Sequence, residues 1–153
     1  MSLEKIKKEY ERYGFSNFDS VNKEFELSSV EIDKWDFLNS FCRVINGKLN
    51  KFLGYSSALF MPGGNYNAVV QAGIKDKTVI EEAKNIYKAL MIVSHDCLKA
   101  EMADEKTQIA FIKDFLKVYP SYKKRIFVLL DVCKQVYVEQ SSEKKKDSHG
   151  YLG

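Results

Sequence analysis

The feature that most constrains the fold of this chain is an amphipathic stretch over residues 78–102. Its apolar side chains recur at three- and four-residue steps, which places them on one face of an α-helix. They are Val79, Ile80, Ala83, Ile86, Tyr87, Leu90, Met91, Cys97, Leu98 and Met102. Thr78 and Glu81 open the stretch as a capping box, because their side chains can accept hydrogen bonds from backbone amides that a helix leaves free. A helix this long has an apolar face that other elements must cover.

The same spacing predicts four further helices, over residues 2–13, 28–53, 104–119 and 121–140. Gly14 and Gly54 stand where the first two would end, since glycine readily takes the left-handed conformation of a helix C-terminus. Pro120 is expected to end the helix over 104–119, because proline lacks the amide that the next turn needs. Side chains that can cap the starts of the last three helices are Ser28 or Ser29, Asp104 and Ser121.

Two segments do not follow this pattern. Residues 15–27 fit neither the helical nor the strand period, and we expect an ordered connector whose rings pack on the body of the protein. Residues 55–74 contain the strongest turn signal of the chain, the Pro-Gly-Gly-Asn sequence at 62–65. The apolar runs 58–61 and 68–70 can pair as a hairpin around this turn, or the turn can separate the ends of two helices.

We therefore expect a mainly α-helical protein, a four- to five-helix bundle with an irregular or short β-hairpin segment around residues 55–74. A chain of 153 residues is near the commonest size of one domain, so we expect a single helical domain over residues 1–140. Residues 141–153 are too polar to join a core and are expected to form a flexible tail. The ten Phe and nine Tyr residues predict a core built around aromatic rings.

The three cysteines, Cys42, Cys97 and Cys133, are too few and too far apart for a disulfide framework. Each lies at or beside the apolar face of a different predicted helix. No Cys-x-x-Cys or His-x-x-x-His pair is present to hold two metal ligands at once. We therefore expect reduced thiols packed in the core, and neither a metal nor another cofactor.

The N-terminal residues and the longest apolar run indicate where in the cell the protein is expected. The N-terminal residues 1–12 are charged on almost every turn and lack the apolar region of a secretory signal. The longest apolar run, residues 89–93, is too short to span a bilayer. We expect a cytoplasmic protein that makes no use of a membrane.

The turn at 62–65 is bracketed by aromatic side chains and is the first candidate for a ligand-binding surface. It lacks the Lys-Ser/Thr pair that would complete a phosphate-binding loop. The residues predicted to bind a ligand there are Tyr55, Phe60, Tyr66 and His95. A small ligand-binding protein or enzyme with a pocket near this turn is therefore one alternative function.

A catalytic role for His95 is not favoured. Asp96 and Cys97 follow it directly, and successive residues on a helix point about 100° apart, so these three side chains do not face one another. No second constellation supplies partners from elsewhere. We therefore predict no catalytic residue.

The formal net charge is only +3, and the basic excess gathers at two places. One is Lys123, Lys124 and Arg125, beside Tyr122, which could stack on a base; the other is the run 144–146. These residues can bind phosphates, which makes a nucleic-acid accessory subunit another alternative. The lack of a continuous basic surface disfavours it.

Residues 121–140 are apolar nearly all round, because Phe127, Val128, Val132 and Val138 lie opposite the main stripe, which we expect to be covered and which consists of Ile126, Leu130, Cys133 and Tyr137. A helix of this kind is either central in its own bundle or buried against another chain. The helix over 78–102 competes for the central place. We therefore predict a homodimer interface on one of the two helices.

The predicted contacts are Phe127, Val128 and Val132 on the later helix, or Ile92 on the earlier one. The leading hypothesis for function is accordingly a non-enzymatic interaction or assembly module. Self-association is its simplest form. A different protein is the alternative partner.

Overall fold

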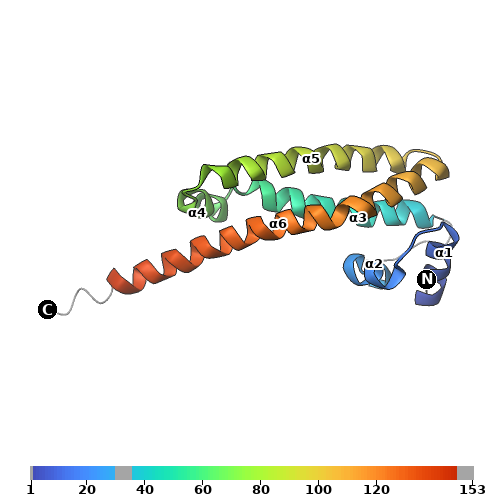
Figure 1. Ribbon diagram of the computed structural model, residues 1–153, viewed down its shortest axis with the longest axis horizontal. Coiled ribbons are helices and arrows are strands. Elements are labelled where there is room, and N and C mark those ends of the chain that lie inside the picture. The colour runs from blue at the N-terminus through green and yellow to red at the C-terminus, as the bar shows by residue number, and fades with distance from the viewer. Residues whose placement is uncertain (1, 30–35, 148–153) are drawn as a thin grey trace. The chain divides into compact units, whose positions relative to one another are not determined.

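Six α-helices make up most of the part of the chain that the structure describes (Figure 1). The computed structural model describes residues 2–29 and 36–147, with side chains over 2–28 and 36–143, and no strand lies within these ranges. The helices are α1 Leu3–Arg12, α2 Phe18–Phe25, α3 Phe37–Ser57, α4 Asn65–Gly73, α5 Lys77–Glu101 and α6 Glu105–Asp147, with a 3-10 turn, η1, over Leu27–Ser29. The prediction of a mainly α-helical protein is confirmed, whereas the predictions of four to five helices and of a β-hairpin are wrong.

The segment expected to form a hairpin, residues 55–74, instead contains the end of α3 and the whole of α4. Gln71 Nε2 donates hydrogen bonds to the carbonyl oxygens of Ala58 at 3.0 Å and of Met61 at 2.7 Å. A hairpin would pair such carbonyls with the amides of a neighbouring strand. Because a side chain of α4 satisfies them here, the turn at 62–65 separates the ends of two helices.

The connector predicted over residues 15–27 contains the short helix α2. Two residues in the left-handed conformation bound it, Asn17 (φ 61°) before it and Glu26 (φ 53°) after it. A helix of 8 residues is too short to establish a clear period in the sequence. The rings of the segment are buried, as expected: Phe15, Phe18 and Phe25, together with the side chain of Leu27.

Pro120 lies inside α6 rather than at the end of a helix. Its missing amide deprives the Leu116 carbonyl of the usual donor four residues on, and proline in a helix interior costs about 3 kcal/mol. Buried side chains at helical spacing nevertheless continue on both sides of the proline: Ile112, Phe115, Tyr119, Ile126, Leu129 and Cys133. The prediction of two helices divided at Pro120 is therefore wrong, because their packing overrides the local preference.

Some predictions concern parts of the chain that are not described. The helix predicted over 28–53 was expected to begin across residues 30–35, which lie outside the described residues, as do residues 148–153 of the predicted tail. α6 itself continues past Gln140 to Asp147. The single domain over 1–140 stays a prediction.

The chain forms two compact units. Unit 1 comprises residues 1–51 and 90–120, and unit 2 comprises residues 52–89 and 121–153. The helices α3, α5 and α6 each supply residues to both units.

Unit 1 is built around aromatic side chains. Tyr10 and Phe41 are fully buried, with their ring centroids 6.0 Å apart. The Tyr10 hydroxyl donates a hydrogen bond to the Ser16 carbonyl oxygen at 2.8 Å, and the Tyr119 hydroxyl donates to Glu24 Oε1 at 2.5 Å. Since both phenols have acceptors, their rings are buried without an unpaired polar group.

The three cysteines are buried and free, in agreement with the prediction of packed thiols. In unit 1, Cys97 Sγ donates a hydrogen bond to the Cys42 carbonyl oxygen at 3.3 Å. The pKa of Cys97 is raised far above its usual value. The largest cause is the hydrogen bond with the Cys42 side chain, and the second is burial. A thiol held neutral in this way is a poor nucleophile and a poor metal ligand.

In unit 2, α4 and α5 pack against the second half of α6. A Cβ atom at Gly73 of α4 would lie 2.2 Å from Val136 Cγ1 of α6, so the two helices approach closely there. Arg125 Nε of α6 donates a hydrogen bond to Glu82 Oε1 of α5 at 2.6 Å. These contacts fix which side of α6 is covered within unit 2 and which side faces solvent.

Candidate interaction surface

The solvent-facing side of α6 in unit 2 carries a group of large apolar side chains. The exposed fractions are 52% for Phe127, 56% for Val128, 39% for Tyr137 and 48% for Val138. Single exposed apolar residues are common on protein surfaces and need no explanation. These four instead lie within a few turns of one helix, and we refer to them together as the α6 face.

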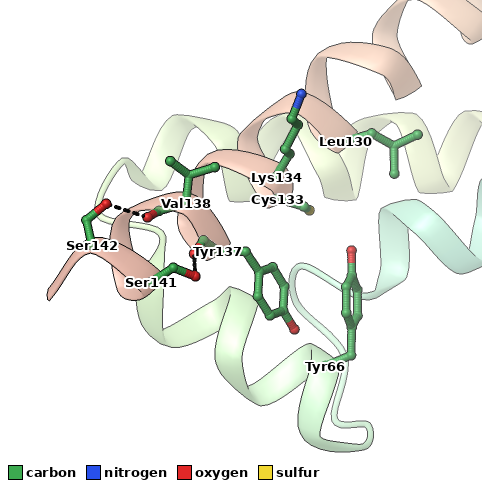
Figure 2. A pocket seen from close by; sticks show the side chains of 8 residues that line it. All are labelled: Tyr66, Leu130, Cys133, Lys134, Tyr137, Val138, Ser141 and Ser142. Atoms are coloured by element: carbon green, nitrogen blue, oxygen red, sulfur yellow. Dashed lines mark hydrogen bonds between the residues drawn. The ribbon is translucent and has the colours of Figure 1, made fainter. Parts of the chain in front are cut away.

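An open groove lies beside the α6 face (Figure 2). It has a volume of about 620 Å³ and runs along α6, with one wall from α4. That wall is Tyr66, whose ring stacks on the ring of Tyr137 with centroids 5.8 Å apart and planes at 21°. The remaining lining residues are Leu130, Cys133, Lys134, Val138, Ser141 and Ser142.

The serine hydroxyl groups of the groove are already bonded to α6 itself. Ser141 Oγ donates to the Tyr137 carbonyl oxygen at 2.8 Å, and Ser142 Oγ donates to the Val138 carbonyl oxygen at 3.0 Å (Figure 2). Lys134 is exposed and is the one cationic side chain among the lining residues. The groove therefore presents mainly aromatic and aliphatic surface.

The Tyr66 phenol and the Cys133 thiol in the groove both keep their protons near neutral pH. Burial, together with the adjacent Cys133 thiol, raises the pKa of Tyr66 to about 12. Burial also raises the pKa of Cys133, although the hydrogen bond with Tyr66 acts in the opposite direction. Because both groups stay neutral near pH 7, neither is an activated nucleophile or base.

The structure places the four predicted ligand-binding residues differently. Tyr66 lines the groove and Tyr55 is exposed, while Phe60 packs edge-on against Tyr87 with centroids 5.5 Å apart. His95 belongs to unit 1, where it is exposed and its Nδ1 lies 2.7 Å from the carbonyl oxygen of its own helix one turn back. Ligand binding by these residues stays a prediction.

The three basic residues predicted to bind nucleic acid are also in different surroundings. Arg125 is engaged by Glu82, and Lys123 Nζ lies 5.5 Å from the centre of the Phe127 ring. Lys124 is exposed. The side chains of residues 144–146 lie outside the described part of the chain, and nucleic-acid binding stays a prediction.

Of the predicted interface residues, Phe127 and Val128 are exposed within unit 2, whereas Val132 is half-buried. Val132 lines a separate groove of about 300 Å³ that is formed with residues 73–76 and Val79. Ile92 is exposed on unit 1, but the residues one turn further on are polar. The homodimer interface itself stays a prediction.

Sequence reasoning missed Tyr137, which was assigned to the covered side of the helix. It also missed the groove, because the stacking of Tyr137 on Tyr66 joins residues far apart in sequence. A signal for the exposed side was present in the alternating spacing of residues 127, 131, 134 and 138.

The described residues contain no group of three or more His, Cys, Asp or Glu side chains placed to hold a metal ion. Within the same ranges, every helix is too short or too polar to cross a membrane.

Comparison with protein-family models, with curated proteins and with solved structures finds no match to this chain.

Proposed function

We propose that this chain is an assembly module, which binds a second copy of itself through the α6 face. The observation that carries the proposal is the exposure of Phe127, Val128, Tyr137 and Val138 on one stretch of α6. Burying apolar surface stabilises an association by roughly 25 cal/mol per Å². Exposed charged side chains border these residues, among them Lys124 and Glu139, as at the rim of a protein interface.

The chemistry of the groove favours a protein partner over a small ligand. Small-molecule sites usually orient their ligand with a few free polar groups. Here Ser141 and Ser142 donate to the backbone of α6. What the groove offers to a partner is mainly the paired rings of Tyr66 and Tyr137, a surface suited to apolar side chains.

We also propose that the module has no catalytic role and works in the cytoplasm. The thiols of Cys97 and Cys133 are held in the neutral form, which is not the reactive form of cysteine. Three free cysteines in buried positions are typical of proteins from reducing compartments.

The proposal is tested by the mass of the protein in solution, measured by sedimentation equilibrium over a range of concentrations. The wild-type chain is expected to form a dimer. Phe127→Lys and Val138→Lys are each expected to give a monomer that keeps its helical circular dichroism, because both side chains face solvent within unit 2.

Ile92→Lys is the matched control, because it places the same charge on an exposed apolar position of α5. This variant should remain dimeric. A wild-type chain that stays monomeric at every concentration would show that the proposed function is wrong. Dissociation by Ile92→Lys alone would place the interface on α5 instead.

A further inference from the structure

We infer that the second copy lies antiparallel on α6, with the two-fold axis passing between Val132 and Cys133. Each Phe127 then meets Val138 of the other copy, and each Asp131 meets Lys134. This inference rests on the proposed function, since it specifies how the two α6 faces pair.

The first support is the spacing of the exposed positions. The exposed side chains of α6 include a series separated by alternating steps of three and four residues: Lys124, Phe127, Asp131, Lys134, Val138 and Ser141. This is the spacing of a seam between two coiled helices. We call this series the α6 seam.

The second support is the order of chemical types along the seam. Read outward from its midpoint, the seam has a charge at Asp131 and Lys134, then an apolar side chain at Phe127 and Val138. A two-fold interface must be complementary to itself, so that residue i of one copy meets residue j of the other and j meets i. The seam meets this requirement when the helices run in opposite directions.

The charges distinguish this arrangement from a parallel one. In a parallel pair every seam residue would meet its own copy, which would place Asp131 against Asp131 and Lys134 against Lys134. Like charges in contact across an interface oppose association. The antiparallel pair replaces both repulsions with two Asp131 to Lys134 ion pairs related by symmetry.

Disulfide formation between two single-cysteine variants, Lys124→Cys and Ser141→Cys, tests the inference. In the antiparallel pair these positions face each other, whereas equal positions are about 26 Å apart along the helix at 1.5 Å per residue. A disulfide needs Cα atoms within roughly 7 Å. The expected result is a covalent dimer on a non-reducing gel from the mixed variants, and none from either variant alone.

The native cysteines do not interfere, because all three are buried, and the wild-type chain under the same oxidation is the control. A covalent dimer from each variant alone would reveal a parallel pair and overturn the inference, while leaving the assembly function in place. A dimer by mass without any disulfide in the mixture would overturn the antiparallel register as well. A monomer by mass would instead remove the assembly function and the inference with it.

Discussion

Gly73 of α4 and Val136 of α6 lie so close together that a methyl group does not fit between them. A Cβ at Gly73 would be 2.2 Å from Val136 Cγ1, 3.1 Å from Cγ2 and 3.2 Å from Cβ. Valine has little freedom at χ1, and Val136 is buried, so it cannot turn aside. Glycine at this position therefore sets the distance between the two helices.

Gly73→Ala should lower the free energy of unfolding by about 1–3 kcal/mol, as overpacking of a core does. Urea unfolding followed by circular dichroism measures it. Gly54→Ala is the control, because Gly54 is an exposed helical glycine with open space around it. This control should be neutral or stabilising by up to about 1 kcal/mol. Equal stability of Gly73→Ala and the wild type would mean that the helices can move apart without cost.

Pro120→Ala should stabilise the protein by about 1–3 kcal/mol, because alanine restores an amide donor for the Leu116 carbonyl and favours the helix. Thermal unfolding monitored at the helical circular dichroism signal measures the change. Lys117→Ala, at an exposed position of the same helix, is the control and should change the stability by less than about 0.5 kcal/mol. A destabilised Pro120→Ala variant would indicate that the local geometry at the proline is required by the packing around it.

The buried phenol of Tyr10 makes stability depend on alkaline pH. Burial raises its pKa from 10.0 to about 12. Between these values the unfolded chain has lost a proton that the folded chain still holds, so stability present below pH 10 is lost as the pH rises toward 12.

The difference in stability between Tyr10→Phe and the wild type should therefore become smaller at high pH. Near neutral pH the variant should be less stable than the wild type by about 1 kcal/mol, because the hydrogen bond to Ser16 is lost. At about pH 11 the difference should shrink, since phenylalanine has no proton to lose. Urea unfolding at the two pH values measures both. A deficit that grows with pH would contradict the direction of the pKa shift.

Reversing one charge of the α6 seam should weaken the dimer. Asp131→Lys replaces two ion pairs with two repulsions between lysines, and each exposed pair is worth up to about 1 kcal/mol. The dissociation constant should rise roughly tenfold or more. The double exchange, Asp131→Lys with Lys134→Asp, should restore most of the affinity, and sedimentation equilibrium at low salt measures all three proteins.

The exchange variant is itself the control for folding, because it carries both substitutions. Failure of the exchange to restore affinity, in a protein with unchanged helical content, would contradict direct pairing of Asp131 with Lys134. Added salt should reduce the difference between the three proteins, since it screens exposed charges.

Helices with a long repeating period could be predicted closely from the sequence. The helix predicted over 78–102 is α5, Lys77–Glu101, and Asp104 caps α6 through the Thr107 amide at 2.8 Å as expected. The capping box did not form as predicted. Asp76 Oδ1 accepts the Thr78 amide at 2.9 Å instead, because the helix begins one residue earlier.

What could not be predicted depends on contacts distant in sequence. α4 relies on Gln71 reaching the end of α3, and α6 continues through Pro120 because apolar side chains on both sides of it are buried. The candidate surface was predicted in part. Phe127 and Val128 were assigned to the side of α6 that proves exposed, but Tyr137 was not, because which side of α6 is covered depends on how α4 and α5 pack against it.

The division of the chain between its units has a consequence for synthesis on the ribosome. Unit 1 consists of residues 1–51 and 90–120, so its first half is made well before the second half that covers it. In unit 2, the segment 52–89 is likewise made before the residues from 121 onward that cover it. Apolar faces of incomplete domains are prone to aggregation while a chain is growing. We therefore expect nascent chains that stop before residue 90 to depend on chaperones, and both units to be completed only as the last helix emerges.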